Sequence, residues 1–169
     1  MILTKLLYKL KMKIIYTNKK EEIFLDYGDF ELLSNYTWYL DNGYARTNSK
    51  KLSAYMHKLI LNIKDKTIFC DHIDGNRANN QKHNLRLCNI QQNAQNRIPR
   101  NKYKGISFKK KFNKYESNIG IDGKLIYLGY FDSEIEAAEK YDIAAIYYHK
   151  EFAKLNFPEK KNSYPEYVK

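Results

Sequence analysis

Cysteine, proline and glycine are all scarce in this sequence. Its 169 residues include 2 cysteines, 3 prolines and 7 glycines. Cys70 and Cys88 cannot form a Cys-x-x-Cys knuckle, so a structural zinc site with three or four cysteine ligands is excluded. One possible pair is too few for a disulfide scaffold in a chain of this size, and two reduced, half-buried thiols are expected. The few glycines and prolines also exclude a linker protein and a collagen-like chain.

Long apolar runs and an acidic surplus are absent as well. No stretch approaches the roughly 20 apolar residues that cross a bilayer, so an integral membrane protein is excluded. Lys and Arg number 30 against 19 Asp and Glu, which gives a formal net charge of +11, while 43% of the residues are hydrophobic. A folded chain this basic indicates a polyanionic partner, with nucleic acid first and an anionic membrane surface second. Lysine enrichment from an AT-rich coding sequence would produce the same surplus, so charge alone does not choose.

The first half of the chain alternates quickly between short elements. Residues 1–12 are expected to be an extension or a frayed start. Short strands are predicted at 14–16 and 23–25, and a short helix at 29–33. Asn42-Gly43 is a strong hairpin-turn signal between the runs 37–39 and 44–46, and a mainly apolar segment follows at 54–61.

Residues 67–97 predict a strand, a long loop, a second strand and a helix, which together make a ββα unit. The first strand covers 67–73 and ends in the turn Asp74-Gly75. The loop at 76–84 is rich in asparagine and is not expected to be buried. The second strand covers 85–88, and Asn89 is a good N-cap for a helix over 90–97.

Four polar residues of this unit could hydrolyse a phosphodiester. His72 is the side chain best suited to take a proton from water near neutral pH. Asp71 and Asn93 offer the carboxylate and amide oxygens that suit Mg²⁺. Asn84 lies at the exit of the loop. Because adjacent strand residues point to opposite faces, Asp71 and His72 are not expected to face one phosphate unless the strand twists or ends there.

The run C-D-H-I-D-G-N-R-A-N-N from Cys70 to Asn80, followed by N-L-R from Asn84 and then by Asn93, resembles the HNH endonuclease family, closest to its homing and phage-type branch. The resemblance implies a ββα-metal (His-Me finger) fold with His72 as the general base. It implies that Asp71 and Asn93 hold one Mg²⁺ or Mn²⁺ ion and that Asn84 braces the loop. Products with 5′-phosphate and 3′-hydroxyl ends are implied, and a structural zinc site is not.

Two further histidines lie near the motif. His57, followed by Leu59-Ile60, resembles the segment that precedes the motif in that branch, and is expected to be packed or hydrogen-bonded rather than catalytic. His83 matches nothing in the family pattern and is expected to be an exposed loop residue.

A basic run joins this unit to the rest of the chain. No acidic residue falls between 97 and 114. A solvated connector is one interpretation of such a run, and contact with DNA phosphates is the one we favour. The predicted DNA-binding residues are Arg97, Arg100, Lys102, Lys104, Lys109, Lys110, Lys111, Lys114 and, beyond the run, Lys124.

The last third of the chain predicts a second small domain. Three strands are expected at 105–108, 115–121 and 125–131, with a hairpin turn at Asp122-Gly123, followed by a helix that Ser133 opens in a capping box with Glu136. The segments Y-K-G-I-S at 103–107, Y-L-G-Y-F-D at 127–132 and L-N-F-P at 155–158 resemble the ethylene-response-factor (APETALA-type) DNA-binding domain. Tyr115-Glu116 replaces the Trp-Arg pair of that family, and lysines replace its first-strand arginines. Weaker and less selective binding is therefore inferred.

The sequence thus predicts an α+β protein with a β-rich extension, an HNH domain over 13–97 with its ββα core at 67–97, a basic linker at 98–102, a three-stranded antiparallel sheet on one helix over 103–158, and a tail at 159–169. The predicted function is metal-dependent cleavage of double-stranded DNA by a monomer in the cytoplasm, neither secreted nor membrane-bound. One alternative is a DNA-binding regulator with an inactive nuclease site. The other is a packaging protein that binds nucleic acid without specificity.

Overall fold

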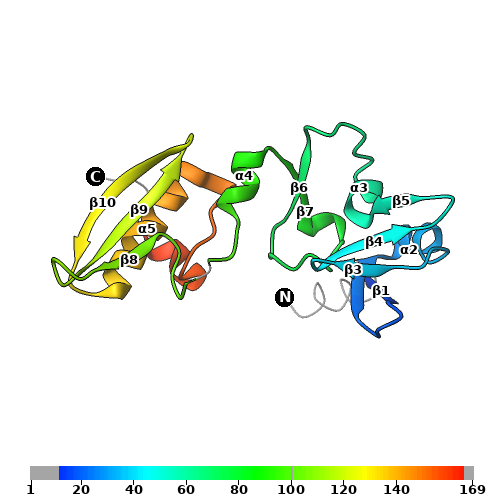
Figure 1. The fold of residues 1–169 in the computed structure, drawn as a ribbon, viewed down its shortest axis with the longest axis horizontal. Coiled ribbons are helices and arrows are strands. Elements are labelled where there is room, and N and C mark those ends of the chain that lie inside the picture. The colour runs from blue at the N-terminus through cyan, green and yellow to red at the C-terminus, as the bar shows by residue number, and fades with distance from the viewer. Residues whose placement is uncertain (1–11, 100, 166–169) are drawn as a thin grey trace. The chain divides into compact units, whose positions relative to one another are not determined.

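The computed structural model describes residues 12–99 and 101–165 and divides the chain into two compact units, residues 1–89 and 90–169 (Figure 1). Both units mix helices with small antiparallel sheets, as the sequence predicted. The predicted extension at 1–12 lies outside the described residues except for Met12, which begins the first strand. None of the helices in the described part of the chain is long and apolar enough to cross a membrane.

The first unit contains one two-stranded sheet, one three-stranded sheet and a hairpin. β1 (Met12–Tyr16) pairs with β2 (Glu22–Asp26), and α2 (Tyr27–Leu33) follows. β3 (Tyr39–Asp41), β4 (Tyr44–Asn48) and β5 (Ser53–Tyr55) form the second sheet in that order. α3 (Met56–Ile60) then leads to β6 (Phe69–His72), the 3₁₀ turn η1 (Lys82–Asn84) and β7 (Leu85–Cys88).

The predicted hairpin at Asn42-Gly43 is confirmed. Asn42 has a φ of 50° and Gly43 a φ of 83°, so both residues occupy the left-handed region that a two-residue hairpin turn of this hand requires. The turn pairs Asp41 with Tyr44 and thereby fixes the register of β3 and β4. This register places Tyr44 at the start of β4, where it becomes part of the candidate site.

The core of the first unit surrounds Trp38, whose side chain is 1% exposed. Its indole Nε1 donates a 2.7 Å hydrogen bond to the carbonyl oxygen of Leu33 at the end of α2. Burial of the only polar atom of this ring is therefore compensated. Other buried members of this cluster are Ile15, Ile23, Leu25, Leu33, Ala45 and Met56.

The second unit has the predicted order of elements. It begins with α4 (Ile90–Gln95), which is shorter than the predicted 90–97. The three strands β8 (Ile106–Lys109), β9 (Lys114–Ile121) and β10 (Lys124–Phe131) form an antiparallel sheet in the order β10-β9-β8. α5 (Glu134–His149) follows, and its N-cap Ser133 accepts a hydrogen bond from the backbone N–H of Ile135. Two short 3₁₀ turns, η2 (Lys150–Phe152) and η3 (Pro158–Ser163), end the described chain.

Helix α5 packs closely on one face of the sheet because small residues lie between them. Ala144 and Ala145 are fully buried and cluster with Ile119 and Tyr141. Gly105 has a φ of +78°, and a Cβ there would lie 2.1 Å from a ring carbon of Tyr141. Only glycine fits this position, because it meets both the left-handed backbone and the close approach of the ring.

The predicted domain boundaries and the two units differ in where they place one element. The prediction ends the first domain at residue 97, whereas the structure groups α4 with the second unit. Asn93 lies on α4 and is therefore part of that second unit. The division into an HNH domain at 13–97 and a DNA-binding domain at 103–158 stays a prediction.

Candidate active site

The hairpin of β6 and β7 positions the first two residues of the predicted site. Asp71 pairs with Arg86 across the hairpin, and His72 pairs with Leu85. His72 is the last residue of β6, and Gly75, with a φ of 80°, turns the chain immediately afterwards. Asp71 and His72 are 5% and 4% exposed, so both side chains are almost entirely covered.

Asn84 holds together the two ends of the loop that follows His72. Its side-chain oxygen accepts a 2.9 Å hydrogen bond from the backbone N–H of Asp74. Its side-chain nitrogen donates to the Asp74 carboxylate and to the carbonyl oxygen of Asn79, each at 2.9 Å. Its own carbonyl oxygen accepts from the backbone N–H of Ile73. Asn84 therefore contacts the chain directly after His72, which is the geometry that a bracing role requires.

The expectation that residues 76–84 are not buried is wrong. Asn80 is fully buried, and Ala78, Gln81 and Asn84 are buried too. The loop lies along β2 like a short additional strand, because Phe24 exchanges backbone hydrogen bonds of 3.0 and 2.7 Å with Ala78 and Asn80. These bonds satisfy the polar groups that burial would otherwise leave without water.

The loop is also tied to β2 through Asp26. The carboxylate of Asp26 accepts 2.9 Å and 3.3 Å hydrogen bonds from the backbone N–H of Lys82 and from the side chain of Gln81. Lys82 also forms an ion pair of 2.9 Å with Asp29 on α2. β2 and α2 therefore hold the loop between β6 and β7 in place.

Asp71 and His72 contact different partners, as the alternation of strand residues predicted. The guanidinium of Arg86 donates to one carboxylate oxygen of Asp71 at 2.8 Å from Nε and 2.6 Å from Nη2. The two side chains are only 16% and 6% exposed, so this is a shielded ion pair. The pair fixes the orientation of the Asp71 carboxylate.

His72 lies instead among aromatic rings from β4 and α3. Its ring centroid is 5.7 Å from that of Tyr44 and 5.4 Å from that of His57. Burial lowers the pKa of His72, while a hydrogen bond with Asn80 acts in the opposite direction. The lowered pKa favours the neutral imidazole, which is the form that can accept a proton.

His57 is packed, as its sequence context predicted. It is 6% exposed, stacks on Tyr55 at 5.6 Å with an interplanar angle of 17°, and lies 5.5 Å from Tyr44. Burial, reinforced by His72 nearby, lowers the pKa of His57 to about 3. Its Nδ1 atom is buried and has no hydrogen-bond partner among the described residues.

Two arginines flank this ring cluster and were not singled out from the sequence. The exposed Arg77 lies with its guanidinium 4.6 Å from the Tyr44 ring centroid and donates to the carbonyl oxygen of Asn42. Arg46 lies 5.2 Å from the Tyr55 ring and forms an ion pair with Asp41. Arg77 follows His72 by five residues, and this short separation is the one feature of the sequence that could have placed it near the candidate site. Arg77 brings positive charge to the vicinity of His72, whereas the charge of Arg46 is paired with Asp41.

Asn93 is half-buried on α4 in the second unit, and its role as a metal ligand together with Asp71 stays a prediction.

The two cysteines are buried free thiols. Burial raises the pKa of Cys70 to about 12 and that of Cys88 to about 11, so both stay protonated at neutral pH. Within the described ranges, no group of three or more His, Cys, Asp and Glu residues is placed to hold a metal ion.

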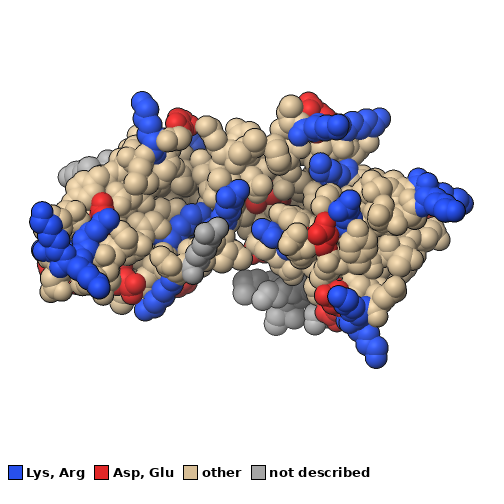
Figure 2. Space-filling model, viewed as in Figure 1, with Lys and Arg blue, Asp and Glu red and all other residues tan. Residues whose placement is uncertain are grey.

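The predicted DNA-binding residues differ in how far the protein already engages them. Lys109 and Lys114 form ion pairs with Glu116 and Asp132, at 2.5 and 3.1 Å. Lys104 donates to the backbone carbonyl groups of Gln95 and Arg97. Figure 2 shows Lys and Arg side chains gathered over the β8–β9 turn. Lys102 is exposed but forms a 3.5 Å ion pair with Glu134. Arg97, Lys110, Lys111 and Lys124 are exposed, and Arg100 lies outside the described residues.

No family model and no solved structure matches the chain. One part of it is similar to plant proteins: it is 41% identical over 64 residues to an AP2-like ethylene-responsive transcription factor of Arabidopsis thaliana. It is also 42% identical over 55 residues to an APETALA2-like protein of Oryza sativa. Each match covers about a third of this chain and 13% of the plant protein.

A second comparison covers far more of the chain. It is 31% identical over 138 residues to an uncharacterised HNH endonuclease of Acanthamoeba polyphaga mimivirus. The match spans 79% of this chain and 73% of the viral protein. Together with the hairpin that carries Asp71, His72 and Asn84, this shows that the chain belongs to the HNH endonuclease family.

Proposed function

We propose that the chain is a metal-dependent endonuclease that hydrolyses phosphodiester bonds in double-stranded DNA, and that its second unit anchors the duplex. The observation that carries the proposal is the placement of His72 at the end of β6, beside Asp71 and in front of a loop that Asn84 holds in place. This placement occurs in a chain that belongs to the HNH endonuclease family.

His72 is the proposed general base. It would take a proton from water while the water oxygen bonds to phosphorus and the bond from phosphorus to the 3′ oxygen breaks. The 3′ oxygen takes up a proton from solvent, and the products carry a 5′-phosphate and a 3′-hydroxyl. The lowered pKa of His72 supports this role because the neutral ring is available near neutral pH. Asn84 would act through the loop, as a positioning residue.

Asp71 and Asn93 are the proposed ligands of one Mg²⁺ or Mn²⁺ ion. The donors fit such an ion chemically, because they are carboxylate and amide oxygens. Mg²⁺ keeps several of its waters and needs few protein ligands, so two oxygen donors suffice. When bound, it would neutralise charge on the scissile phosphate and on the leaving oxygen. Arg86 would hold the Asp71 carboxylate in one orientation.

Arg77 and Arg46 would help to bind the substrate. Both guanidinium groups lie against rings of the cluster around His72, at 4.6 and 5.2 Å. An exposed guanidinium binds phosphate oxygens through two parallel hydrogen bonds. Arg77 is the exposed member of the two, and we assign to it contact with a phosphate near the cleaved bond.

The second unit is the proposed anchor on the duplex. It supplies the exposed basic residues Lys110, Lys111 and Lys124, and it contains the segments 103–107, 127–132 and 155–158 that resemble the ethylene-response-factor type of DNA-binding domain. Lysine binds phosphate as a point charge and lacks the fork that reads guanine, so the anchor would supply affinity more than selectivity. We infer that the protein acts as a monomer wherever its target DNA lies.

A cleavage assay on a randomised library of duplex DNA tests the proposal. The purified chain with Mg²⁺ is expected to release fragments with 5′-phosphate and 3′-hydroxyl ends, and a chelator is expected to stop the reaction. Binding without cleavage across several divalent metals would contradict the proposal. It would favour the regulator with an inactive nuclease site, which the plant likeness supports. Equal binding to all duplexes, again without cleavage, would favour the packaging protein.

A further inference from the structure

One face of the three-stranded sheet in the second unit is not covered by α5. The helix packs on the face that carries Ile106, Ile119 and Ile126. Since successive strand residues point to opposite sides, the neighbours of these residues belong to the other face. The strand register places these neighbours on the same face, because Tyr127 pairs with Asn118, Leu125 with Gly120, and Ser107 with Glu116. We call this the outer face of the sheet.

The outer face is apolar and aromatic over β10. Leu125 is 73% exposed, Tyr127 is 54% exposed and Tyr130 is 39% exposed. The ring of Tyr130 contacts those of Tyr127 and Phe112, with centroids 5.3 and 5.1 Å apart. Exposed apolar side chains that are contiguous on a sheet indicate a binding surface.

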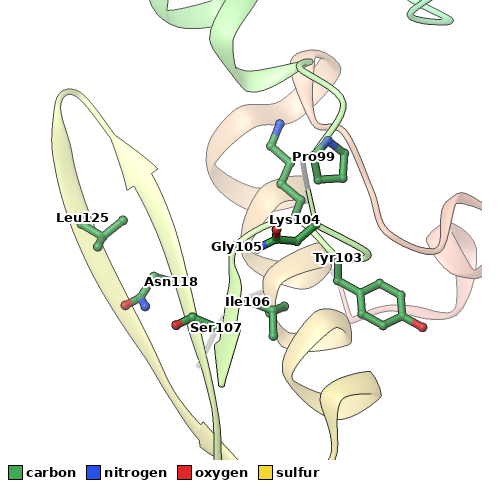
Figure 3. A pocket seen from close by; sticks show the side chains of 9 residues that line it. Pro99, Tyr103, Lys104, Gly105, Ile106, Ser107, Asn118 and Leu125 are labelled. Carbon is green, nitrogen blue, oxygen red and sulfur yellow. The ribbon is translucent and has the colours of Figure 1, made fainter. Parts of the chain in front are cut away.

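Asn118 lies beside these apolar groups, near the middle of β9. It is half-buried, and its side-chain amide forms no hydrogen bond with the described part of the chain. Its backbone N–H, in contrast, donates to the carbonyl oxygen of Gly105, which fixes the strand. Leu125, Asn118 and Ser107, one from each strand, line a pocket together with residues of the segment 99–106 (Figure 3). The volume of this pocket is about 310 Å³.

The charged groups of the outer face are already engaged with one another. Glu116 forms an ion pair with Lys109, and its side chain is only 15% exposed. Lys114 forms an ion pair with Asp132. β8, β9 and β10 contain no arginine, the side chain that reads guanine best. The groups left to contact bases are therefore the Asn118 amide, the Ser107 hydroxyl, and the leucine and tyrosine side chains of β10.

These groups match one kind of base pair. Adenine offers N7 and the N6 amino group in the major groove, which an asparagine amide can bind with two hydrogen bonds. Thymine offers a C5-methyl group, which apolar side chains contact. The groove admits a two-stranded ribbon, and β9 and β10 form such a ribbon with eight residues in each strand. Lys110 and Lys111 in the β8–β9 turn and Lys124 at the start of β10 are exposed, and their charge is complementary to DNA phosphates.

We propose that the outer face reads A·T base pairs in the major groove of duplex DNA, with Asn118 on adenine and with Leu125 and Tyr127 on thymine methyl groups. This inference rests on the proposed function, since it requires that the second unit binds duplex DNA. It adds a preference for A·T base pairs, which the absence of arginine from the three strands does not by itself predict. The protein is an A·T-selective anchor, weak on G·C sites.

Base analogues test the inference without altering the protein. The full chain is titrated, in a chelator and at one salt concentration, into labelled A·T-rich duplexes while fluorescence anisotropy is followed. Deoxyuridine in place of thymidine removes the methyl groups, and 7-deazaadenine removes the N7 acceptor. Each change is expected to weaken binding about fivefold or more, and a G·C-rich duplex of the same length to bind more weakly still.

Variants assign the effects to residues. Asn118→Ala is expected to abolish the response to 7-deazaadenine and to keep the response to deoxyuridine. Tyr127→Ser is expected to reduce the response to deoxyuridine and to keep the response to 7-deazaadenine. Tyr147→Ser is the matched control, because Tyr147 is an equally exposed tyrosine on α5, which packs on the other face. It is expected to leave both responses unchanged.

The outcomes separate the two proposals. If the A·T-rich duplex binds and neither analogue weakens it, the A·T inference is overturned while the anchoring role stands. If no duplex binds, both are overturned. Tighter binding to the single strand than to the duplex would also overturn the inference, since the rings would then stack on bases. A variant that fails to fold leaves the analogue titrations with the parent protein as the deciding result.

Discussion

Mild acid is expected to destabilise the first unit through His57. The pKa of this buried ring is lowered from 6.5 to about 3, so the folded state keeps it neutral where the unfolded state binds a proton. Because the unfolded state then binds more protons, stability is present above 6.5 and is lost as the pH falls from there towards 3. Each pH unit in this window costs about 1.4 kcal/mol, so acidification to about pH 5 is expected to cost about 2 kcal/mol.

Trp38 provides the assay. It is the only tryptophan and is buried in the first unit, so its fluorescence reports the unfolding of that unit in guanidinium chloride. His57→Gln replaces the ring by an uncharged side chain of similar size. Between neutral pH and about pH 5, the free energy of unfolding of the variant is expected to fall by about 2 kcal/mol less than that of the parent. This difference is expected whatever the stability of the variant at neutral pH.

His83→Gln is the matched control, because His83 is an exposed histidine of the same unit. It is expected to keep the pH dependence of the parent. If His57→Gln loses as much stability on acidification as the parent, the reasoning is refuted, since another group must then carry the proton uptake.

Three other perturbations have defined outcomes. Arg86→Met removes the ion partner of the buried Asp71 and is expected to lower the free energy of unfolding of the first unit by about 3 kcal/mol in the Trp38 assay. Arg86→Lys is expected to lower it by less, and a denaturation midpoint equal to that of the parent would show that the ion pair does not stabilise the fold. Gly105→Ala forces a Cβ against the Tyr141 ring and is expected to cost about 2 kcal/mol or more in a circular-dichroism melt of the second unit, and a parent-like melt would contradict the packing. Replacing both Lys110 and Lys111 by alanine is expected to lower the slope of log binding constant against log salt by about 2, and no change would make the run a connector only.

Local signals in the sequence predicted the elements well. The Asn42-Gly43 turn fixed the hairpin, and the alternation of side chains along a strand placed Asp71 and His72 against different partners. These features depend on residues a few positions apart, whose conformational preferences are visible in the sequence. The bracing bonds of Asn84 likewise lie within the motif that indicated them.

Contacts between distant segments could not be predicted. The loop at 76–84 is buried because Phe24 bonds to Ala78 and Asn80, more than fifty positions away, and its polarity alone indicated exposure. The cluster of Tyr44, His57 and His72 similarly comes from three elements. No single segment carries the pattern, since the cluster depends on how the sheets pack together.

The rate of cleavage of supercoiled plasmid DNA with Mg²⁺ tests the central claim most directly. The parent chain is expected to nick or linearise the plasmid. His72→Ala is expected to reduce the rate by about 100-fold or more while retaining DNA binding, because the general base is lost. His83→Ala is expected to cleave like the parent. Equal rates for His72→Ala and the parent would contradict the assignment of His72 as the base, and with it the proposed mechanism.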